Sequence, residues 1–320
     1  MQQIINLKKY LNKPLKQKKQ IFFYKIKKRK FYEKEKYKSH LRVTKSFDRN
    51  PLIKEGGQRV KGCYKYSLKQ NPLITIVTVV LNNEKDLENT IKSVLLQKYV
   101  NIEYIIIDGG SKGSVIAKIK KYEDFIDYWI SQKDKGIFDA YNKALRLANG
   151  DYICFLNVGD YFTEKALDYI IKKIKNKKLD VIFGSVKKNI IHTGFNINNI
   201  RKSLNIFPSL TSSFINHQLF KKNGLFNLKY SCYNDYEFIY RVIKTNKLNY
   251  LTTNKNQLIT VFDLKGYSSR VNFFRQLYEE FRIRYQYEHS FLIFVKLASK
   301  LLGYFFLKYT NQKKFKKYNY

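Results

Sequence analysis

Short runs of almost wholly apolar, largely β-branched residues recur along this chain, and they constrain its fold more than any other feature. The longest is 73–81, LITIVTVVL, and similar runs occupy 102–107 and 152–156. Strands of this kind have both faces buried, as in parallel sheets that helices cover on both sides. Segments with apolar residues at helical spacing lie between them. The alternation predicts an α/β protein with a mostly parallel sheet flanked by helices.

The remaining helices and strands are predicted from the same two patterns, apolar residues at helical spacing and short apolar runs. Residues 190–216 are rich in asparagine and poorly periodic, so we expect a long loop that lines the functional site. We divide the chain into a basic N-terminal arm (1–72), a globular domain (73–270) and an amphipathic helical tail (271–320). We expect helices at 84–97, 115–122, 137–148, 164–175 and from 234 onward, and further strands at 125–130 and 181–184.

The charge balance narrows the choice of partners. The 320 residues include 62 lysines and arginines against 25 aspartates and glutamates, a net charge of +37. The excess is densest in the two arms, which indicates a polyanion partner, either nucleic acid or an anionic membrane face. The chain is also rich in lysine, asparagine and isoleucine throughout, so part of the excess reflects composition. The three cysteines show no metal or disulfide spacing and the N-terminus has no apolar signal region, which favours a reducing, cytoplasmic location.

Carboxylates fall where predicted elements end or begin. Asp108 ends the second apolar run, Asn157-Val158-Gly159-Asp160 follows the third, and Asp235 precedes a helix. Open α/β sheets bind ligands at the carboxyl ends of their strands, and carboxylates there can hold a divalent cation. The alternative is an ordinary turn with a capping side chain. The common nucleotide-binding glycine loops are absent.

Five segments in order, at family spacing, resemble the inverting glycosyltransferases of family 2, which have the GT-A fold. The resemblance covers roughly residues 74–270. The segments are TIVTVVLNNEKDLENTIKSV (75–94), IEYIIIDGGSKGS (102–114), DYWISQKDKGIFDAYNKALRLANGDYICFLNVGDYF (127–162), HQLF (217–220) and NDYEFIYR (234–241).

The resemblance implies a role for each motif. The family's Asp-x-Asp metal motif falls on Asn157 to Asp160, with asparagine first and an extra glycine, so Asp160 keeps the metal role and Asn157 can bind ribose or sugar. The catalytic base falls on Asp235. Residues implied to bind the nucleotide-sugar, besides Asn157, are Val80, Asn82, Glu84, Asp108, Asp134 and Lys135, and those implied on the acceptor side are His217, Gln218 and Glu237.

These roles fit the chemistry of glycosyl transfer. Negative charge grows on the departing diphosphate, and a Mg²⁺ or Mn²⁺ ion at Asp160 would neutralise it. A base on the other side takes the acceptor's proton, which allows in-line displacement with inversion. Simpler interpretations stay open: Asp108 as a turn cap, Asp134 and Lys135 as a solvated pair, and His217 as a satisfied loop histidine.

The tail suggests a membrane. Residues 291–309, FLIFVKLASKLLGYFFLKY, approach a spanning length but contain three lysines. The cost of burying those lysines offsets the apolar gain, so a span is not favoured. We expect an amphipathic helix on an anionic membrane surface, with a helix packed on the domain as the alternative.

The sequence thus predicts a glycosyltransferase that moves a sugar from a nucleotide donor, most simply a UDP-sugar, to a saccharide or lipid-linked saccharide. It would work in surface polysaccharide synthesis at the inner face of the cell membrane. A nucleic-acid-binding protein is the first alternative, but it leaves the apolar strands ending in Asp108 and Asp160 unexplained, so we expect no nucleic acid. An inactive scaffold is the second, and the intact Asp108, Asp160 and Asp235 argue against it.

Overall fold

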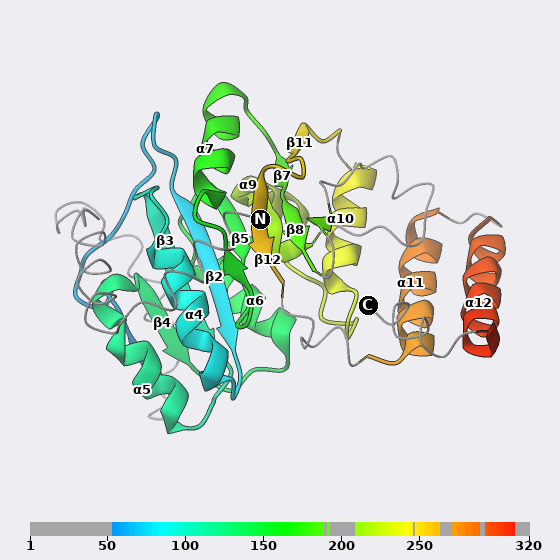
Figure 1. Ribbon diagram of the computed structural model, residues 1–320, viewed down its shortest axis with the longest axis horizontal. Helices are drawn as coiled ribbons and strands as arrows, with labels where there is room; N and C mark the ends of the chain where they lie inside the picture. The colour runs from blue at the N-terminus through cyan, green and yellow to red at the C-terminus, as the bar shows by residue number, and fades with distance from the viewer. Residues whose placement is uncertain are drawn as a thin grey trace.

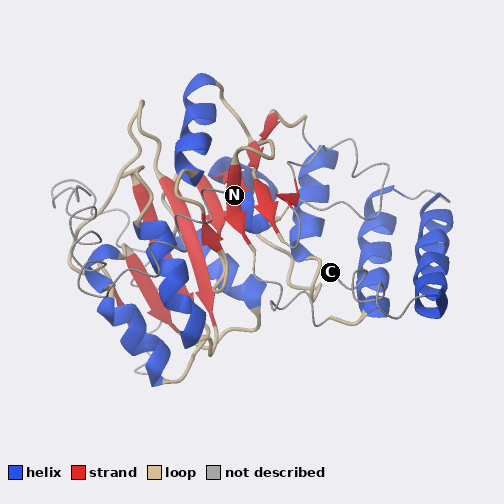
Figure 2. Ribbon diagram, viewed as in Figure 1, coloured by secondary structure: helices blue, strands red, loops and turns tan. Residues whose placement is uncertain are grey.

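The computed structural model describes residues 53–188, 191–192, 209–245, 247–262, 271–288 and 292–310. Its main sheet is drawn in red at the centre of Figure 2, with helices in blue around it. The strand order is β1-β4-β3-β2-β5-β10-β7-β11. The strands are β1 (Lys54–Gly56), β2 (Ile74–Val80), β3 (Ile102–Asp108), β4 (Tyr128–Ser131), β5 (Tyr152–Phe155), β7 (Val181–Phe183), β10 (Ser213–Asn216) and β11 (Tyr250–Thr252).

The centre of this sheet is parallel, as the apolar runs predict. β2 pairs in parallel with β3 on one side and β5 on the other, and β3 pairs in parallel with β4. Every residue of β2 and β3 is buried. In β3, Ile105 and Ile107 enter one core and Ile106 enters the other, so both faces need apolar side chains. Among the described strands of this main sheet, β1 and β10 alone run antiparallel to their neighbours.

Helices cover both faces of the sheet (Figure 1). One core lies beneath α4, α5 and α7, and the other beneath α6, α9 and α10. The helices bury apolar residues at the spacing that predicted them. Their bounds are α4 (Glu84–Leu95), α5 (Gly113–Lys121), α6 (Ile137–Leu147), α7 (Ala166–Asn176), α9 (His217–Asn223) and α10 (Asn234–Thr245).

A second, smaller sheet of order β6-β12-β8-β9 extends from the turn after β5. β12 lies between β6, with Val261 opposite Tyr161, and β8, with Val261 opposite Lys187. This register places the residues that flank the three strands, Asp160, Phe262 and Lys188, along one edge. The strands are β6 (Tyr161–Phe162), β8 (Ser185–Lys187), β9 (Ile191–His192) and β12 (Leu258–Val261).

The folded domain begins earlier than residue 73, so that predicted boundary is wrong. β1 pairs with β4, and Lys65 makes a buried ion pair with Asp127 at 2.8 Å. Arg59 pairs in the same way with the buried Glu103. Because these basic residues meet buried carboxylates, they belong to the fold and not to a solvated arm. The rest of the predicted arm, residues 1–52, lies outside the described residues.

The predicted loop at 190–216 is wrong in its last part. Residues 210–212 form a short 3-10 helix and Ser213–Asn216 is β10, which lies between β5 and β7. The strand has only two apolar residues, Phe214 and Ile215, both fully buried. Four residues with polar ends give too short a pattern to recognise. Residues 193–208, most of the expected loop, lie outside the described part.

The tail forms two helices, α11 (Phe273–Glu288) and α12 (Leu292–Thr310). α11 lies against α10, and α12 lies beyond α11 at one end of the molecule (Figure 1). Ile293, Leu297 and Tyr304 of α12 are buried, and Tyr304 stacks on Phe273 of α11. The alternative of a helix packed on the protein is therefore confirmed for this face of α12. Within the described ranges, every helix is too short or too polar to cross a membrane.

Candidate active site

The parallel strands bring the predicted site residues to one edge of the sheet. Val80 pairs with Asp108, and Asp108 pairs with Ser131, at the carboxyl ends of β2, β3 and β4. β5 runs parallel to β2, and its last residues lead directly into Asn157 and the turn that ends at Asp160. The sheet therefore gathers side chains that are far apart in sequence along a single edge.

Asp108 is fully buried at the centre of this edge. Its carboxylate accepts hydrogen bonds from the Ser131 hydroxyl at 2.5 Å and from the Ser111 amide at 3.0 Å. These bonds join the loops that follow β3 and β4, so Asp108 acts as the turn cap that we kept as an alternative. Direct contact with a nucleotide base stays a prediction.

The loop after β2 is hydrogen-bonded to the turn that follows β3. The Asn82 amide donates to the Ser111 hydroxyl at 2.7 Å, and its side-chain oxygen accepts from the Lys112 amide at 3.2 Å. Asn82 has a φ of +51°, which asparagine tolerates better than most residues. Glu84 instead pairs with Lys118 of α5 at 3.5 Å, so the structure does not bring it into this loop cluster.

Asp134 lies beside the cluster, whereas Lys135 points to solvent. A Cβ built on Gly109 would lie 2.4 Å from the Asp134 carboxylate, so glycine is needed for this approach. Burial raises the pKa of Asp134, with Asp108 and Asp139 adding to the effect. Lys135 is exposed, and only its backbone amide is engaged, with Asp139 at 3.1 Å. The solvated alternative therefore fits Lys135 and not Asp134.

The turn at residues 157–160 explains the extra glycine in the motif. Gly159 has a φ of +99°, which would strain other residues. The Thr90 hydroxyl of α4 accepts from the Gly159 amide at 3.1 Å and donates to the Asp160 carbonyl at 2.9 Å. Asn157 accepts a hydrogen bond from the Tyr141 hydroxyl. Asp160 is 3% exposed, so its carboxylate is fixed at the edge rather than mobile on the surface.

Asp235 lies half-buried in the first turn of α10. Burial raises its pKa to about 6, although its hydrogen bond from the Tyr236 amide and the charge of Lys188 act in the opposite direction. A carboxylate of this pKa is ionised near neutral pH yet basic enough to accept a proton. These are the properties that a general base requires.

Lys188 lies within the electrostatic reach of both Asp160 and Asp235. It is partly buried after β8, its ammonium lies 4.9 Å from the centre of the Phe262 ring, and the charges of both carboxylates act on it. Burial lowers the pKa of Lys188, and the two carboxylates oppose that effect. Tyr141 also lies within the electrostatic reach of Asp160 and Asp235. The charges of both carboxylates therefore act on the same two side chains, Lys188 and Tyr141.

Glu237 is turned toward Arg241 and α11, so its predicted acceptor-side position is wrong. It is 1% exposed and holds Arg241 through two contacts of 3.0 and 3.1 Å. The Tyr287 hydroxyl of α11 donates to it at 2.7 Å. Two residues beyond Asp235 on a helix, Glu237 points in a different direction and serves the packing between α10 and α11.

His217 and Gln218 lie at the opposite edge of the sheet, so their predicted acceptor-side position is also wrong. Asn216 at the end of β10 pairs with Tyr152 at the start of β5, because β10 runs antiparallel. His217 is buried there against the Gly150 carbonyl at 3.2 Å. The satisfied histidine that we kept as an alternative is what the structure contains.

The residues present fit a cation only if it binds together with a phosphate. The described part of the chain contains no group of three or more His, Cys, Asp or Glu side chains placed to hold a metal ion. Asp160 offers one carboxylate, and the Asn157 oxygen is already engaged with Tyr141. Mg²⁺ is commonly held by one or two carboxylates plus substrate phosphates, which matches this donor set.

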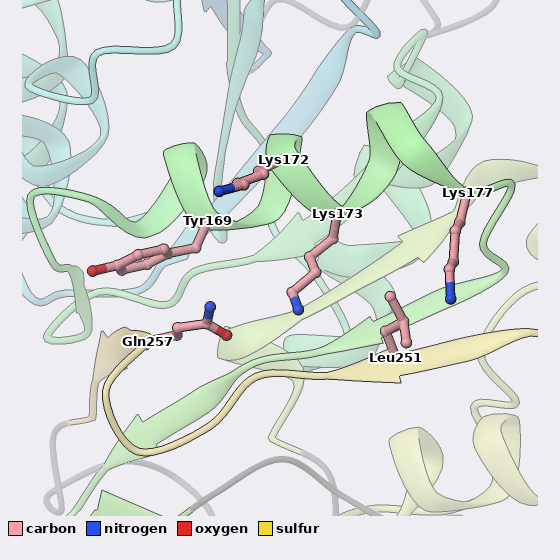
Figure 3. Close-up of a pocket in the computed structure, with 6 residues that line it drawn as sticks. All are labelled: Tyr169, Lys172, Lys173, Lys177, Leu251 and Gln257. Carbon is pink, nitrogen blue, oxygen red and sulfur yellow. The ribbon is translucent and has the colours of Figure 1, made fainter.

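A separate hollow of about 380 Å³ lies between α7 and the strands beside it (Figure 3). Its lining does not include Asp108, Asp160 or Asp235, so this hollow is distinct from the candidate active site. Its lining residues are Tyr169, Lys172, Lys173, Lys177, Leu251 and Gln257.

Comparison with known proteins identifies the family. The sequence model described as Glycosyl transferase family 2 matches residues 75–234, half of the chain. The chain belongs to glycosyl transferase family 2. The match begins in β2 and ends at the first residue of α10. It therefore includes Asp108, Asp160 and Lys188, whereas β12 and Asp235 lie outside it.

Curated and solved relatives of this family member agree on the fold. The poly(ribitol-phosphate) beta-N-acetylglucosaminyltransferase TarP of Staphylococcus aureus is 29% identical over 219 residues, 57% of this chain and 67% of TarP. S. aureus TarS 1-349 with UDP-GlcNAc has a TM-score of 0.54 at 15% identity, covering 76% and 77% of the two chains. A Pyrobaculum calidifontis mannosyltransferase with GDP-Man and Mn²⁺ has a TM-score of 0.55 at 14% identity, covering 72% and 69%.

These likenesses establish the GT-A fold that the sequence predicts. The chain matches about a third of the length of the curated relatives that it resembles at 39% identity, and about two thirds of TarP. The family model establishes the family, and the donor and acceptor are inferred below from the site.

Sequence reasoning missed Lys188, Tyr141 and Thr90 as members of this site. Lys188 is one lysine among many in a basic chain, and only the register of the second sheet places it beside Asp160. Tyr141 reads as a core residue of α6, and it is indeed 2% exposed, although its hydroxyl reaches Asn157. The available signal was a hydroxyl-bearing side chain among the apolar residues of this helix.

Proposed function

We propose that this chain transfers a sugar from a nucleotide-diphosphate donor, most simply a UDP-sugar, to a saccharide or lipid-linked saccharide with inversion. The observation that carries the proposal is that Asp160 lies at the carboxyl edge of the parallel strands, while its charge and that of Asp235 act on the same two side chains, Lys188 and Tyr141. The UDP-GlcNAc complex of TarS supports a nucleotide-sugar donor. The named activity of TarP supports a role in building a surface polymer.

The two carboxylates divide the reaction between them. Asp160 and Asn157 would meet the diphosphate end of the donor, where a Mg²⁺ or Mn²⁺ ion supplies charge neutralisation when bound. Lys188 adds a fixed positive charge on the same side. Asp235 would take the proton of the acceptor hydroxyl as that oxygen attacks the anomeric carbon. A single displacement of this kind inverts the anomeric centre.

A panel of nucleotide-sugars tests the proposal. We expect one donor to raise the melting temperature of the protein, because a ligand that binds only the folded state stabilises it. The same donor should release its nucleoside diphosphate slowly by hydrolysis, and faster with an acceptor. The proposal fails if UDP-, GDP- and dTDP-sugars all leave both the melting temperature and nucleotide release unchanged.

The pH dependence of turnover should respond to Lys188. Asp235 works only when deprotonated, so turnover should rise with pH through about 6, the pKa of this carboxyl. The positive charge of Lys188 lowers that pKa, so Lys188→Met should move the acidic limb of the rate profile to higher pH. The measurement is kcat against pH for both proteins at saturating donor. Lys187→Met, one residue away in β8, is the control and should leave the limb in place.

We also propose that the tail binds an anionic membrane surface from the cytoplasmic side. One face of α12 packs on α11, whereas Leu302, Phe306 and Tyr309 are 69%, 68% and 96% exposed. The three acidic residues of the tail are turned inward: Glu279 and Glu280 are buried, and Glu288 is 14% exposed. The described outward face of α12 is therefore apolar and carries none of these three acidic side chains, which suits an anionic lipid surface better than a second copy of this basic chain.

Lys300 does not take the lipid-facing role that the sequence suggests. Its ammonium pairs with the buried Glu280 at 2.7 Å, which fixes α12 to α11. Residues 313–317, which include four further lysines, lie outside the described residues. The proposed contact surface therefore consists of the exposed apolar side chains of α12.

Replacing Leu302 and Phe306 together by glutamate should release the protein from anionic vesicles. Each apolar side chain contributes roughly 1.5–3 kcal/mol when it is buried, so partitioning should fall by about a hundredfold or more. Co-sedimentation with vesicles of varied anionic content measures this. Val100→Glu, at an exposed valine of the main domain, is the matched control. Unchanged sedimentation with an altered oligomeric state would instead make this face an interface between copies.

A further inference from the structure

Glu279 of α11 binds the loop that leads into Asp235. Its carboxylate accepts from three successive backbone amides, those of Ser231 at 2.8 Å, Cys232 at 3.0 Å and Tyr233 at 3.2 Å. It also accepts from the Ser231 hydroxyl at 2.6 Å and from the Cys232 thiol at 3.1 Å. Hydrogen bonds to a charged acceptor are stronger than neutral ones, so five of them fix this loop firmly.

The carboxylate of Glu279 is suited to this task. It is 5% exposed. Burial alone would raise the pKa of Glu279, but the hydrogen bonds from Ser231 and Cys232 outweigh that effect and hold the pKa below its usual value. The three amides precede α10, and a negative charge near the N-terminal end of a helix is favourable. Glu279 therefore stays ionised and bound.

Other contacts of α11 act on the same short segment. The Tyr230 hydroxyl bonds Gln286 at 3.1 Å, and the Arg282 guanidinium lies over the Tyr230 ring. On the opposite side, the Asn234 side chain donates to the carbonyls of Asn227 at 2.6 Å and Tyr230 at 2.9 Å. The backbone just before Asp235 is thus held from both sides, and Glu279 makes the largest number of these bonds.

We propose that Glu279 is a positioning residue that sets the place and direction of the Asp235 carboxylate for proton transfer. This inference rests on the proposed function, in which Asp235 is the base. It assigns α11 to the catalytic unit, because a helix outside the segment matched to the family holds the loop that leads into the base. The boundary that we expected at residue 270 therefore separates no independent tail.

Steady-state kinetics with saturating donor and acceptor test this role. Glu279→Gln keeps the size of the side chain but loses the charge, and we expect kcat to fall roughly tenfold to a hundredfold, the cost of a small misplacement of a catalytic group. KM for the donor should stay within about twofold, because Glu279 touches no predicted donor-binding residue. Glu279→Asp, which restores the charge on a shorter side chain, should recover part of the loss.

A double-mutant cycle separates positioning from general damage. If Glu279 acts through Asp235, Glu279→Gln should cost less than about twofold when it is added to Asp235→Asn. Equal losses in both backgrounds would show a merely structural role and overturn the inference. Glu280→Gln is the matched control: Glu280 is equally buried but pairs with Arg284 and Lys300, so it should lower the melting temperature without the same loss in kcat.

Hydrogen exchange gives a readout that needs no activity. The amides of residues 231–233 should exchange at least about tenfold faster in Glu279→Gln than in the unmodified protein, because their acceptor loses its charge. Unchanged protection would overturn the inference whatever the kinetics. If Asp235→Asn keeps full turnover, the proposed base is wrong; if Asp235→Asn is inactive and Glu279→Gln keeps full kcat, only the positioning role is wrong.

Discussion

Asp235→Asn is expected to retain the donor and to lose turnover by roughly 10²–10⁴-fold, the usual contribution of a general base. The asparagine is close in size to the aspartate, and the Tyr236 amide can still donate to its side-chain oxygen. The first turn of α10 should therefore stay intact. Donor-induced thermal stabilisation measures binding, and initial rates of transfer measure turnover.

Glu237→Gln is the matched control for the base. Glu237 lies two residues further along α10 and is engaged by Arg241 and Tyr287, so its loss should lower the melting temperature more than kcat. An inactive but folded Glu237→Gln beside an active Asp235→Asn would show that the wrong acid was chosen. The acidic limb of the rate profile near pH 6 should also disappear in Asp235→Asn.

The centre of the fold was predictable because its strands are buried on both faces. Runs such as 73–81 and 102–107 admit few other structures, and the helices between them follow from apolar spacing. β10 was not predicted, because only two of its four residues are apolar and both ends are polar. Such a strand is recognised by its pairing with β5 and β7, not by its own pattern.

The site was predictable where it depends on strand ends. Asp108, Asn157 and Asp160 reach one edge because parallel strands share a direction. His217 was misplaced because β10 reverses that direction and delivers the next residue to the opposite edge. Lys188 was missed because only the pairing of β6, β12 and β8 in the second sheet brings it near Asp160. Tertiary pairing, which local pattern does not encode, decides these positions.

The role of α11 illustrates the same limit. The sequence of 271–320 is basic, aromatic and helical, which indicated a separate tail. Its three acidic residues carry the structural information, since Glu279 holds the loop before Asp235, while Glu280 and Glu288 meet Arg284. The partners of Glu279 lie in the loop before α10, and Arg284 lies one helical turn from both Glu280 and Glu288. The net charge of the segment does not reveal these individual contacts.

Asp160→Ala should lower turnover by about 10³-fold or more, because a cation at the leaving group supplies several kcal/mol of transition-state stabilisation. The turn should survive the change. Its bonds to Asn157 and Thr90 are made by the backbone of Asp160, and alanine keeps both. Asp168→Ala, at an exposed position in α7, is the control for losing a carboxylate and should leave the rate unchanged.

Chelation distinguishes the two ways in which Asp160 can act. If it holds a divalent cation against the diphosphate, excess EDTA should stop the unmodified enzyme as completely as Asp160→Ala does, and Mg²⁺ or Mn²⁺ should restore it. If instead Asp160 serves mainly to fix the ammonium of Lys188, Asp160→Ala should be inactive while full turnover persists in EDTA. That second result would reject the metal and leave Lys188 to neutralise the leaving group. Because a fixed lysine cannot be removed by a chelator, one titration with EDTA decides between them.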